Sequence, residues 1–418
     1  MTAMDQAQAS ETTAMAGRGV TWAVFLLSGG AIGFEILLMR LLSVALGQYF
    51  AALVISLALL GIGAGGSLLA LARSWAIRRV RLVFPLLACG FGLAALAMTS
   101  LALARAVDFT PQALVWDPSR FQTLVAIYCF LALPFVFSGA GIGLALSAFP
   151  RHIARIYRAD LVGAGLGAPL MLAAFMWAKP EACMPWVLLV GMAAGAVYLL
   201  GQAGPRNTRA GLAVLGLGVT LALLTPVHWA TPVPGQYRPL AKALLLPGAR
   251  ITAERSGPMG WVAVVESDIP IRHAPGMSLN SPYDLPDQAA IFRDGGSLGV
   301  ITRDTGSAED LAFLDALPTA LPYALRPGAE VLVLDAGGGF SVMEALHHGA
   351  AHVTAVEPDS RILDMVTAEY AEFSGNVYTR SQVTTEIAHG RAFLEQSKGG
   401  FGLIMLRGGV PPGGTALP

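Results

Sequence analysis

Long apolar segments dominate the first half of the chain and most constrain its fold. A helix needs about 20 apolar residues to cross the roughly 30 Å hydrocarbon core of a bilayer. Seven segments approach or exceed this length, at residues 21–45, 50–72, 82–104, 121–149, 157–178, 185–201 and 210–227, the last two being the shortest. We therefore expect a bundle of about seven membrane-spanning helices over residues 20–227, with the lipid bilayer as its first partner.

Composition separates this region from the rest of the chain. Only 13% of all residues are charged and 55% are hydrophobic, whereas soluble domains have about 25% charged residues. Ordinary charge density returns from His228 onward. The sequence predicts five parts: a disordered tail at 1–19, the membrane domain at 20–227, a linker at 228–248, a small β lobe at 249–308 and an α/β domain at 309–418. The first apolar segment is too long for a signal-peptide core and is kept as an anchor.

Basic residues are unevenly distributed between the two sides of the predicted spans. One side carries Arg18, Arg73, Arg78, Arg79, Arg81, Arg151, Arg155, Arg158, Arg206 and Arg209. The other side carries only Arg105, Arg120 and Lys179. Because cytoplasmic loops are enriched in Lys and Arg, we expect the first side and the N-terminus in the cytoplasm. With seven spans, the C-terminal region then lies on the opposite side.

Ionisable side chains inside the spans are the polar candidates of the membrane domain. Glu35 is mid-segment, where an uncompensated charge costs about 2.5–3.5 kcal/mol or more, so it must be neutral, paired or water-facing. Arg40 is long enough to reach it, and Asp160 could meet Arg155 or Arg158. An interhelical ion pair that fixes the bundle is the favoured interpretation. The alternative is a carboxylate that couples protons or substrate in a transporter.

Glycines recur four residues apart within the predicted spans. The pairs are Gly29/Gly33, Gly61/Gly65, Gly139/Gly143, Gly163/Gly167 and Gly191/Gly195. Small residues at this spacing let helix backbones approach closely in lipid, where the hydrophobic drive between helices is weak. The pattern predicts a tightly packed bundle.

The soluble half begins with strand-like segments and one helix-like segment. Residues 249–255, 261–266 and 290–293 are separated by Gly, Pro, Asp and Asn, which predicts a small antiparallel β lobe. Residues 310–325 have leucines on one face and end at Pro327-Gly328, which predicts a helix.

A glycine-rich unit follows and predicts a cofactor-binding fold. The continuous apolar run Val331–Leu334 is typical of a buried parallel strand. Three glycines, Gly337, Gly338 and Gly339, allow a tight turn and the close approach of a ligand to the backbone. A helix at 341–348 and a strand at 353–357 should follow, ending at Glu357 about twenty residues after the glycines. This arrangement predicts a Rossmann-like unit in which Glu357 accepts ribose hydroxyls.

Residues 255–406 resemble the spermidine synthases, or polyamine aminopropyltransferases, in the bacterial branch with an N-terminal multi-span membrane region. The soluble half carries the resemblance in Ser256-Gly-Pro-Met-Gly-Trp-Val-Ala-Val-Val-Glu266, Ile291-Phe-Arg-Asp-Gly-Gly296, Asp310-Leu-Ala-Phe-Leu-Asp-Ala-Leu-Pro318, Asp335-Ala-Gly-Gly-Gly339 and Val356-Glu-Pro358. The membrane half carries it in Glu35-Ile-Leu-Leu-Met-Arg-Leu-Leu42 and Tyr157-Arg-Ala-Asp-Leu-Val-Gly-Ala-Gly-Leu-Gly167.

The resemblance implies a fold of the S-adenosylmethionine-dependent transferase type in a bacterial inner-membrane protein. The charge asymmetry and the seven spans, not the resemblance, predict that the soluble domain lies in the periplasm. The cofactor of active members is decarboxylated S-adenosylmethionine. By resemblance, Asp335, Gly337 and Gly339 surround its amino-acid end, and Glu357 holds its ribose.

The sequence departs from this family where the chemistry is done. Ala388-His389-Gly390 stands where active members have Gly-Asp-Gly, and Arg407 stands where they have the catalytic acid. An arginine repels a cationic polyamine. His389 could hydrogen-bond an adenine, although a histidine on a surface turn is the favoured interpretation. The sequence stops at Pro418, before the remaining strands of a full sheet, which predicts either an open sheet edge that a protein partner covers or a continuation of the chain beyond Pro418.

We therefore expect a degenerate spermidine synthase-like domain that acts as a non-catalytic binding or assembly module of a membrane complex. The first alternative is an active aminopropyltransferase, and the second is a small-molecule transporter. No catalytic residue is assigned and no nucleic-acid partner is expected. The scattered cysteines Cys89, Cys129 and Cys183 predict neither a metal site nor a disulfide framework.

Overall fold

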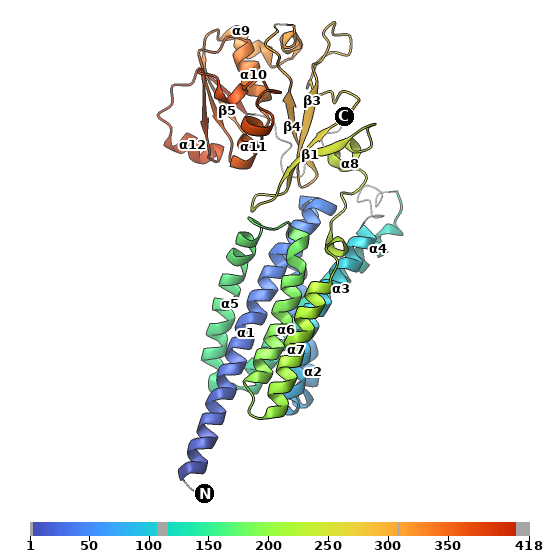
Figure 1. Cartoon of the computed structure of the whole chain (residues 1–418), viewed down its shortest axis with the longest axis vertical. Helices are drawn as coiled ribbons and strands as arrows, with labels where there is room; N and C mark the ends of the chain where they lie inside the picture. The colour runs from blue at the N-terminus through green and yellow to red at the C-terminus, as the bar shows by residue number, and fades with distance from the viewer. Residues whose placement is uncertain (1–2, 107–115, 308, 407–418) are drawn as a thin grey trace. The chain divides into compact units, whose positions relative to one another are not determined.

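The computed structural model describes residues 3–106, 116–307 and 309–406, and the chain divides into two compact units (Figure 1). The helical unit comprises Met1–Gln236 with Ser256–Pro258, and the α/β unit comprises Tyr237–Arg255 with Met259–Pro418. The division falls inside the predicted linker, residues 228–248.

The helical unit contains the predicted apolar segments as long helices. These are α1 (Ala3–Ala45), α2 (Gln48–Arg78), α3 (Val80–Ala106), α4 (Arg120–Ala148), α5 (Ile153–Ala174), α6 (Met184–Leu200) and α7 (Pro205–Leu224). Short 3₁₀ turns accompany them, namely η2 (Pro150–His152), η3 (Pro180–Cys183) and η4 (Val227–Ala230). Helix α1 already begins at Ala3, where a disordered tail was expected over residues 1–19, because Ala, Met, Gln and Glu in this segment are strong helix formers.

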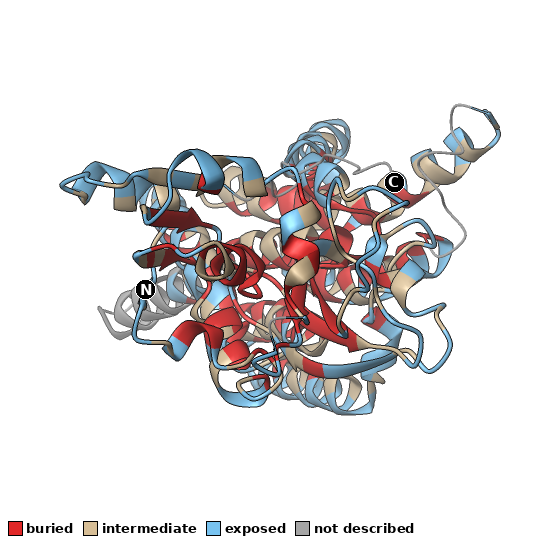
Figure 2. Ribbon diagram, turned by 90° about the horizontal axis from the view of Figure 1, so that it is seen from above, coloured by how far each residue is buried: buried red, intermediate tan, exposed pale blue. Residues whose placement is uncertain are grey.

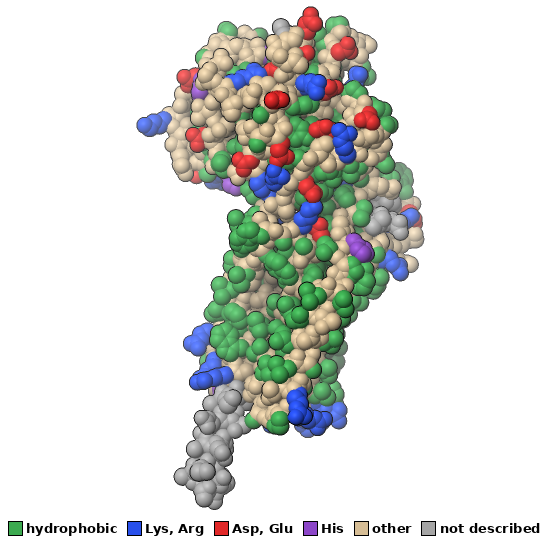
Figure 3. Space-filling model, viewed as in Figure 1, with side chains coloured by type: hydrophobic (Ala, Val, Ile, Leu, Met, Phe, Trp, Pro, Cys, Tyr) green, Lys and Arg blue, Asp and Glu red, His purple; other side chains and the backbone are tan. Residues whose placement is uncertain are grey.

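Six helices among the described residues are long and apolar enough to cross a membrane, as in a multi-pass membrane protein. Seven spans were expected, and the one that falls short is α5, predicted at 157–178. Its first turns carry Arg155, Arg158 and Asp160, which lower its apolar character. The outward surface of the helices is largely hydrophobic (Figure 3), with Leu71 87% exposed.

Glycines bring the helix backbones into contact, as the spacing predicts. An added Cβ at Gly163 would lie 2.3 Å from the carbonyl oxygen of Phe25, and one at Gly167 would lie 2.2 Å from that of Gly29, so only glycine lets α5 pack on α1. Gly65 stands in the same relation to α4, with 2.3 Å to the carbonyl oxygen of Val136.

Two backbone contacts fix the direction of the chain within the helical unit. Gly19, in the first half of α1, lies against Gly201 at the end of α6, where an added Cβ would be 2.8 Å from the Gly201 Cα. Gly235, after α7, donates its backbone N–H to the carbonyl oxygen of Ala45 at the end of α1, at 3.1 Å. The chain therefore leaves the bundle at the end opposite Gly19.

The β lobe forms the first part of the α/β unit. After α8 (Pro239–Ala243), the strands β1 (Arg250–Arg255), β2 (Val262–Glu266), β3 (Gln288–Arg293) and β4 (Gly296–Thr302) form an antiparallel sheet in the order β1-β2-β3-β4. Asp294 and Gly295 join β3 to β4 with φ of +47° and +76°, the two-residue turn that suits the twist of a hairpin. The predicted antiparallel lobe is confirmed.

The second part contains a parallel sheet. Its strands are β5 (Glu330–Leu334), β6 (His352–Val356), β7 (Val383–Glu386) and β8 (Leu403–Leu406), in the order β7-β6-β5-β8. The helical elements are η5 (Ala312–Ala316), α9 (Ala320–Leu325), α10 (Phe340–His347), α11 (Ser360–Asp364), the π-helix η6 (Met365–Glu369), η7 (Val377–Thr379) and α12 (Gly390–Gln396).

The single helix expected over 310–325 is instead two short elements, η5 and α9. Pro318 disfavours the helical conformation at the preceding residue, and Leu317 is extended with ψ of 143°. This proline causes the break between η5 and α9. The spacing of the leucines alone does not reveal that break.

Strand β5, in the middle of the parallel sheet, buries side chains on both faces, in agreement with its continuous apolar run. Val331 and Val333 belong to a large core that also includes Phe340 of α10 and the strands of the β lobe. Leu332 and Leu334 belong to a smaller cluster that Phe393 of α12 covers. Buried residues, red in Figure 2, thus occur in the strands as well as within the helical unit.

Candidate functional site

The glycine loop, residues 335–339, connects β5 to α10 at the carboxyl edge of the parallel sheet. Asp335, Gly337 and Gly339 have φ of +54°, +55° and +86°. These values lie in the left-handed region, which residues other than glycine rarely adopt. Gly339 accepts the backbone N–H of Met343 at 2.8 Å and so begins α10. The structure therefore confirms the predicted order of strand, tight turn and helix.

Glu357 holds this loop from the neighbouring strand. Its Oε2 accepts the backbone N–H of Gly337 at 2.9 Å, and its Oε1 accepts that of Asp359 at 3.1 Å. The residue is only 3% exposed. Both carboxylate oxygens thus have protein donors, although each can accept a second hydrogen bond.

The charge of Glu357 is compensated only in part. Burial raises the pKa of this carboxyl above its ordinary value, while the two backbone hydrogen bonds and the Arg293 guanidinium oppose the shift. The Arg293 guanidinium lies 3.8 Å from Oε1. Arg293 also contacts Asp359 at 3.3 Å, and Asp359 accepts two hydrogen bonds from Arg361, at 2.7 and 2.6 Å. These pairs join β3 to the segment after β6.

Protein atoms fill the space beside the middle glycine. An added Cβ at Gly338 would lie 2.3 Å from the carbonyl oxygen of Val300 on β4. On the other side of the loop, the hydroxyl of Tyr378 donates to the carbonyl oxygen of Gly337 at 2.7 Å. The backbone approach that glycine permits here serves the packing of the loop on the β lobe.

The structure brings some of the predicted site residues together. Asp335, the three glycines and Glu357 meet at the carboxyl edge, and Asp335 is exposed. His389 is also exposed and directly precedes α12. Its neighbour Gly390 packs on Leu334, with 3.4 Å from an added Cβ to the side chain, so His389 lies near the end of β5. Arg407 falls outside the described residues.

The structure gives contacts for two of the polar candidates of the helical unit, Arg40 and Asp160. The guanidinium of Arg40 lies over the ring of Phe175, 5.9 Å from its centroid. Glu35 is half-buried on α1. Within the described residues no ion pair links Asp160 to Arg155 or Arg158. Instead, the backbone carbonyl of Asp160 accepts the hydroxyl of Ser28 at 3.0 Å, which ties α5 to α1.

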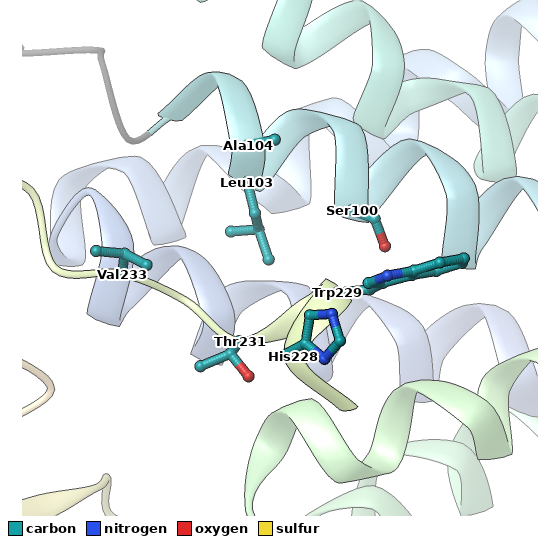
Figure 4. Close-up of a pocket in the computed structure, with 7 residues that line it drawn as sticks. All are labelled: Ser100, Leu103, Ala104, His228, Trp229, Thr231 and Val233. Atoms are coloured by element: carbon teal, nitrogen blue, oxygen red, sulfur yellow. The ribbon is translucent and has the colours of Figure 1, made fainter. Parts of the chain in front are cut away.

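Two surface hollows lie away from the glycine loop. One, of about 420 Å³, is mostly apolar and lies in the helical unit beside α3 and η4 (Figure 4). It is lined by Ser100, Leu103, Ala104, His228, Trp229, Thr231 and Val233. Another, of about 460 Å³, lies in the α/β unit between β1, β2 and η6, where the hydroxyl of Tyr370 donates to Glu266 at 2.8 Å. Glu266 in turn contacts Arg250 at 3.6 Å, so this acidic lining is already paired.

One cluster of chemically versatile side chains was not predicted. Asp315, His347 and His348 have possible metal-ligating atoms within 4.8 Å of one another. The signal that could have found it is the pair of adjacent histidines at the end of the predicted helix. Asp315 lies 32 residues earlier, so only the fold reveals its proximity.

Comparison with protein-family models, with curated proteins and with solved structures finds no match to this chain.

Proposed function

We propose that this protein is a membrane-anchored binding module. Its helices would cross the bacterial inner membrane, and its Rossmann-like α/β unit would bind an adenosine-type ligand without transferring an aminopropyl group. The position of the glycine loop supports the ligand site, because open parallel sheets bind ligands beyond the carboxyl ends of their strands.

The observation that carries the proposal is the backbone of Asp335. Among the described residues, three other than glycine have a left-handed φ, namely Asp294, Asp335 and Asn376. Asp294 belongs to the β3–β4 turn, and Asn376 directly precedes η7. Asp335 instead projects an exposed carboxylate from the end of a buried strand. Left-handed residues of this kind cost about 1–3 kcal/mol and cluster at ligand clamps.

The replacement of two acids supports binding without transfer, and the loop itself remains well ordered by its contacts. An attacking polyamine needs carboxylates that orient and deprotonate it, yet His389 and Arg407 occupy the two positions where the resemblance expects acids. The carboxylate of Glu357 is engaged by the backbone of the glycine loop and the segment after β6. Gly338 is packed on Val300. The unit thus keeps the shape of a nucleoside site while the acids for amine chemistry are replaced.

Calorimetric titration of the full chain in detergent tests the proposal, with methylthioadenosine and decarboxylated S-adenosylmethionine as ligands. Asp335→Asn keeps the left-handed backbone and removes the charge. We expect it to weaken the binding of decarboxylated S-adenosylmethionine about tenfold or more, because the ammonium group of this ligand would lose a hydrogen bond to a charged group, which contributes about 1.5–3 kcal/mol. The matched control is Glu330→Gln, at the opposite end of β5, where the side chain is also exposed.

Two outcomes would contradict the proposal in different ways. If the unaltered protein binds neither ligand at millimolar concentration, the proposed nucleoside site does not exist. Formation of spermidine from putrescine and decarboxylated S-adenosylmethionine, followed by chromatography, would instead establish the active aminopropyltransferase.

Charge distribution supports an orientation with the Gly19 end of the bundle in the cytoplasm. The arginine-rich group identified in the sequence flanks the helix termini at this end, and basic side chains gather there in Figure 3. Because Gly235 meets the end of α1, the chain would enter the α/β unit on the periplasmic side.

A protein partner would bind at β8, an edge strand of the described sheet. An edge strand presents unpaired backbone groups, and here Ile404 and Leu406 are also 50% and 67% exposed. Such a surface suits the assembly role expected of a subunit in a membrane complex.

A further inference from the structure

Asp315, His347 and His348 meet at the amino edge of the parallel sheet. His347 is the last residue of α10, His348 follows it, and Asp315 belongs to η5. Helix α10 starts at the glycine loop and runs back to the start of β6 at His352. The cluster is therefore at the opposite edge of the sheet from Asp335, so it is separate from the proposed nucleoside site.

The distances match the spacing of ligands around one metal ion. The Oδ1 atom of Asp315 is 3.1 Å from Nε2 of His347 and 3.7 Å from Nδ1 of His348. All three ligand atoms lie within 4.8 Å of one another. Zinc bonds of about 2.0–2.1 Å in a tetrahedron separate neighbouring ligand atoms by about 3.4 Å. The two measured distances lie on either side of this value.

The surroundings hold the imidazole of His348 in place and leave a path for an ion. The side chains of His347 and His348 are 18% and 12% exposed, while that of Asp315 is 53% exposed. The ring of Tyr323 stacks on His348 at 5.0 Å between centroids and 20° between planes. His348 is thus fixed by packing, and the carboxylate of Asp315 faces solvent.

We propose that Asp315, His347 and His348 bind one divalent transition-metal ion, for which zinc fits best. Two imidazoles and one carboxylate are ligands that zinc accepts, with water at the fourth position. The ion joins the end of α10 to η5 and thereby stabilises the segment that precedes β5. An ordinary ion pair needs only one imidazole. The second imidazole, that of His348, is too far from Asp315 for a hydrogen bond, but its distance still suits two ligands of one metal ion.

The full chain, purified in detergent and freed of metal with a chelator, is titrated with Zn²⁺ and its metal content is measured. We expect one zinc per chain and a higher unfolding temperature, because an ion that binds only the folded state stabilises it. Asp315→Asn, His347→Asn and His348→Asn should each weaken zinc binding by at least about 100-fold, the upper end of what loss of an outer-shell partner costs. The matched control is His352→Asn, which removes an imidazole that contacts Thr384 at 3.0 Å.

Cobalt substitution keeps the test decisive if a variant fails to fold. Co²⁺ bound to the unaltered protein should give the intense visible absorption of a tetrahedral site, and Zn²⁺ should displace it. The proposal is wrong if the unaltered protein takes up no zinc. It is also wrong if uptake persists in all three variants, or if Co²⁺ shows only the weak spectrum of the hydrated ion.

Discussion

At the scale of single residues, Glu357 combines a charge with a buried structural position. It lies between the backbone of the glycine loop and that of Asp359, and burial raises its pKa. The folded state therefore binds a proton at this carboxyl more tightly than the unfolded chain does. Linkage then requires that its contribution to the free energy of unfolding be largest below the unfolded pKa and decrease as pH rises through the folded pKa.

The variant Glu357→Gln tests this linkage because glutamine does not titrate. We expect the stability of the unaltered protein, relative to the variant, to fall as pH rises from the ordinary carboxyl pKa of 4.5. Hydrogen exchange of the peptide that contains the glycine loop, corrected for intrinsic rates, measures local stability at each pH. A difference that stays constant or increases with pH would contradict the assigned direction.

Individual residues also show where prediction from the sequence ends. The glycines of the loop and the acid at the end of β6 were found by their local spacing, and the structure brings them together. The contact of Gly338 with Val300 and the approach of Asp315 to His347 join segments more than 30 residues apart. No local pattern encodes such pairs, because they depend on how the elements pack.

At the scale of elements, the helix pair α1 and α5 shows why glycine spacing is informative in an apolar bundle. Gly163 and Gly167 place their backbones against the carbonyls of Phe25 and Gly29. The helix that falls short of a free-standing span is thus held closely to its neighbour. The charged residues in the first turns of α5 were visible in the sequence. The close packing of α5 on α1 could be seen only in the structure.

Two glycine-to-alanine substitutions on α5 separate the effect of helix packing from the effect of helix propensity. Gly163→Ala would place a methyl group 2.3 Å from the Phe25 carbonyl, and we expect it to destabilise the bundle by about 1–3 kcal/mol. Gly165→Ala is the matched control, because an added Cβ there meets nothing within 4 Å. Thermal unfolding in detergent compares the two. Equal effects of both substitutions would mean that α5 does not pack on α1 through this face.

At the scale of the whole molecule, the proposed orientation in the membrane rests on helix direction and charge and can be tested by labelling. Asn280→Cys places a thiol on an exposed loop of the α/β unit, and Ala203→Cys places one in the exposed turn between α6 and α7. In intact cells with a permeable outer membrane, a membrane-impermeant maleimide should label the first and not the second. Labelling of Ala203→Cys alone would reverse the proposed orientation.

The contact between Gly338 and Val300 has a mechanical consequence. The loop has no free volume on the side of β4, so a ligand that shifts the loop in that direction must also displace this strand. Strand β4 is paired with β3, whose Arg293 reaches the acids after β6. Displacement of the loop toward β4 would therefore be transmitted as strain to the β3–β4 hairpin and, through Arg293, to the acids after β6.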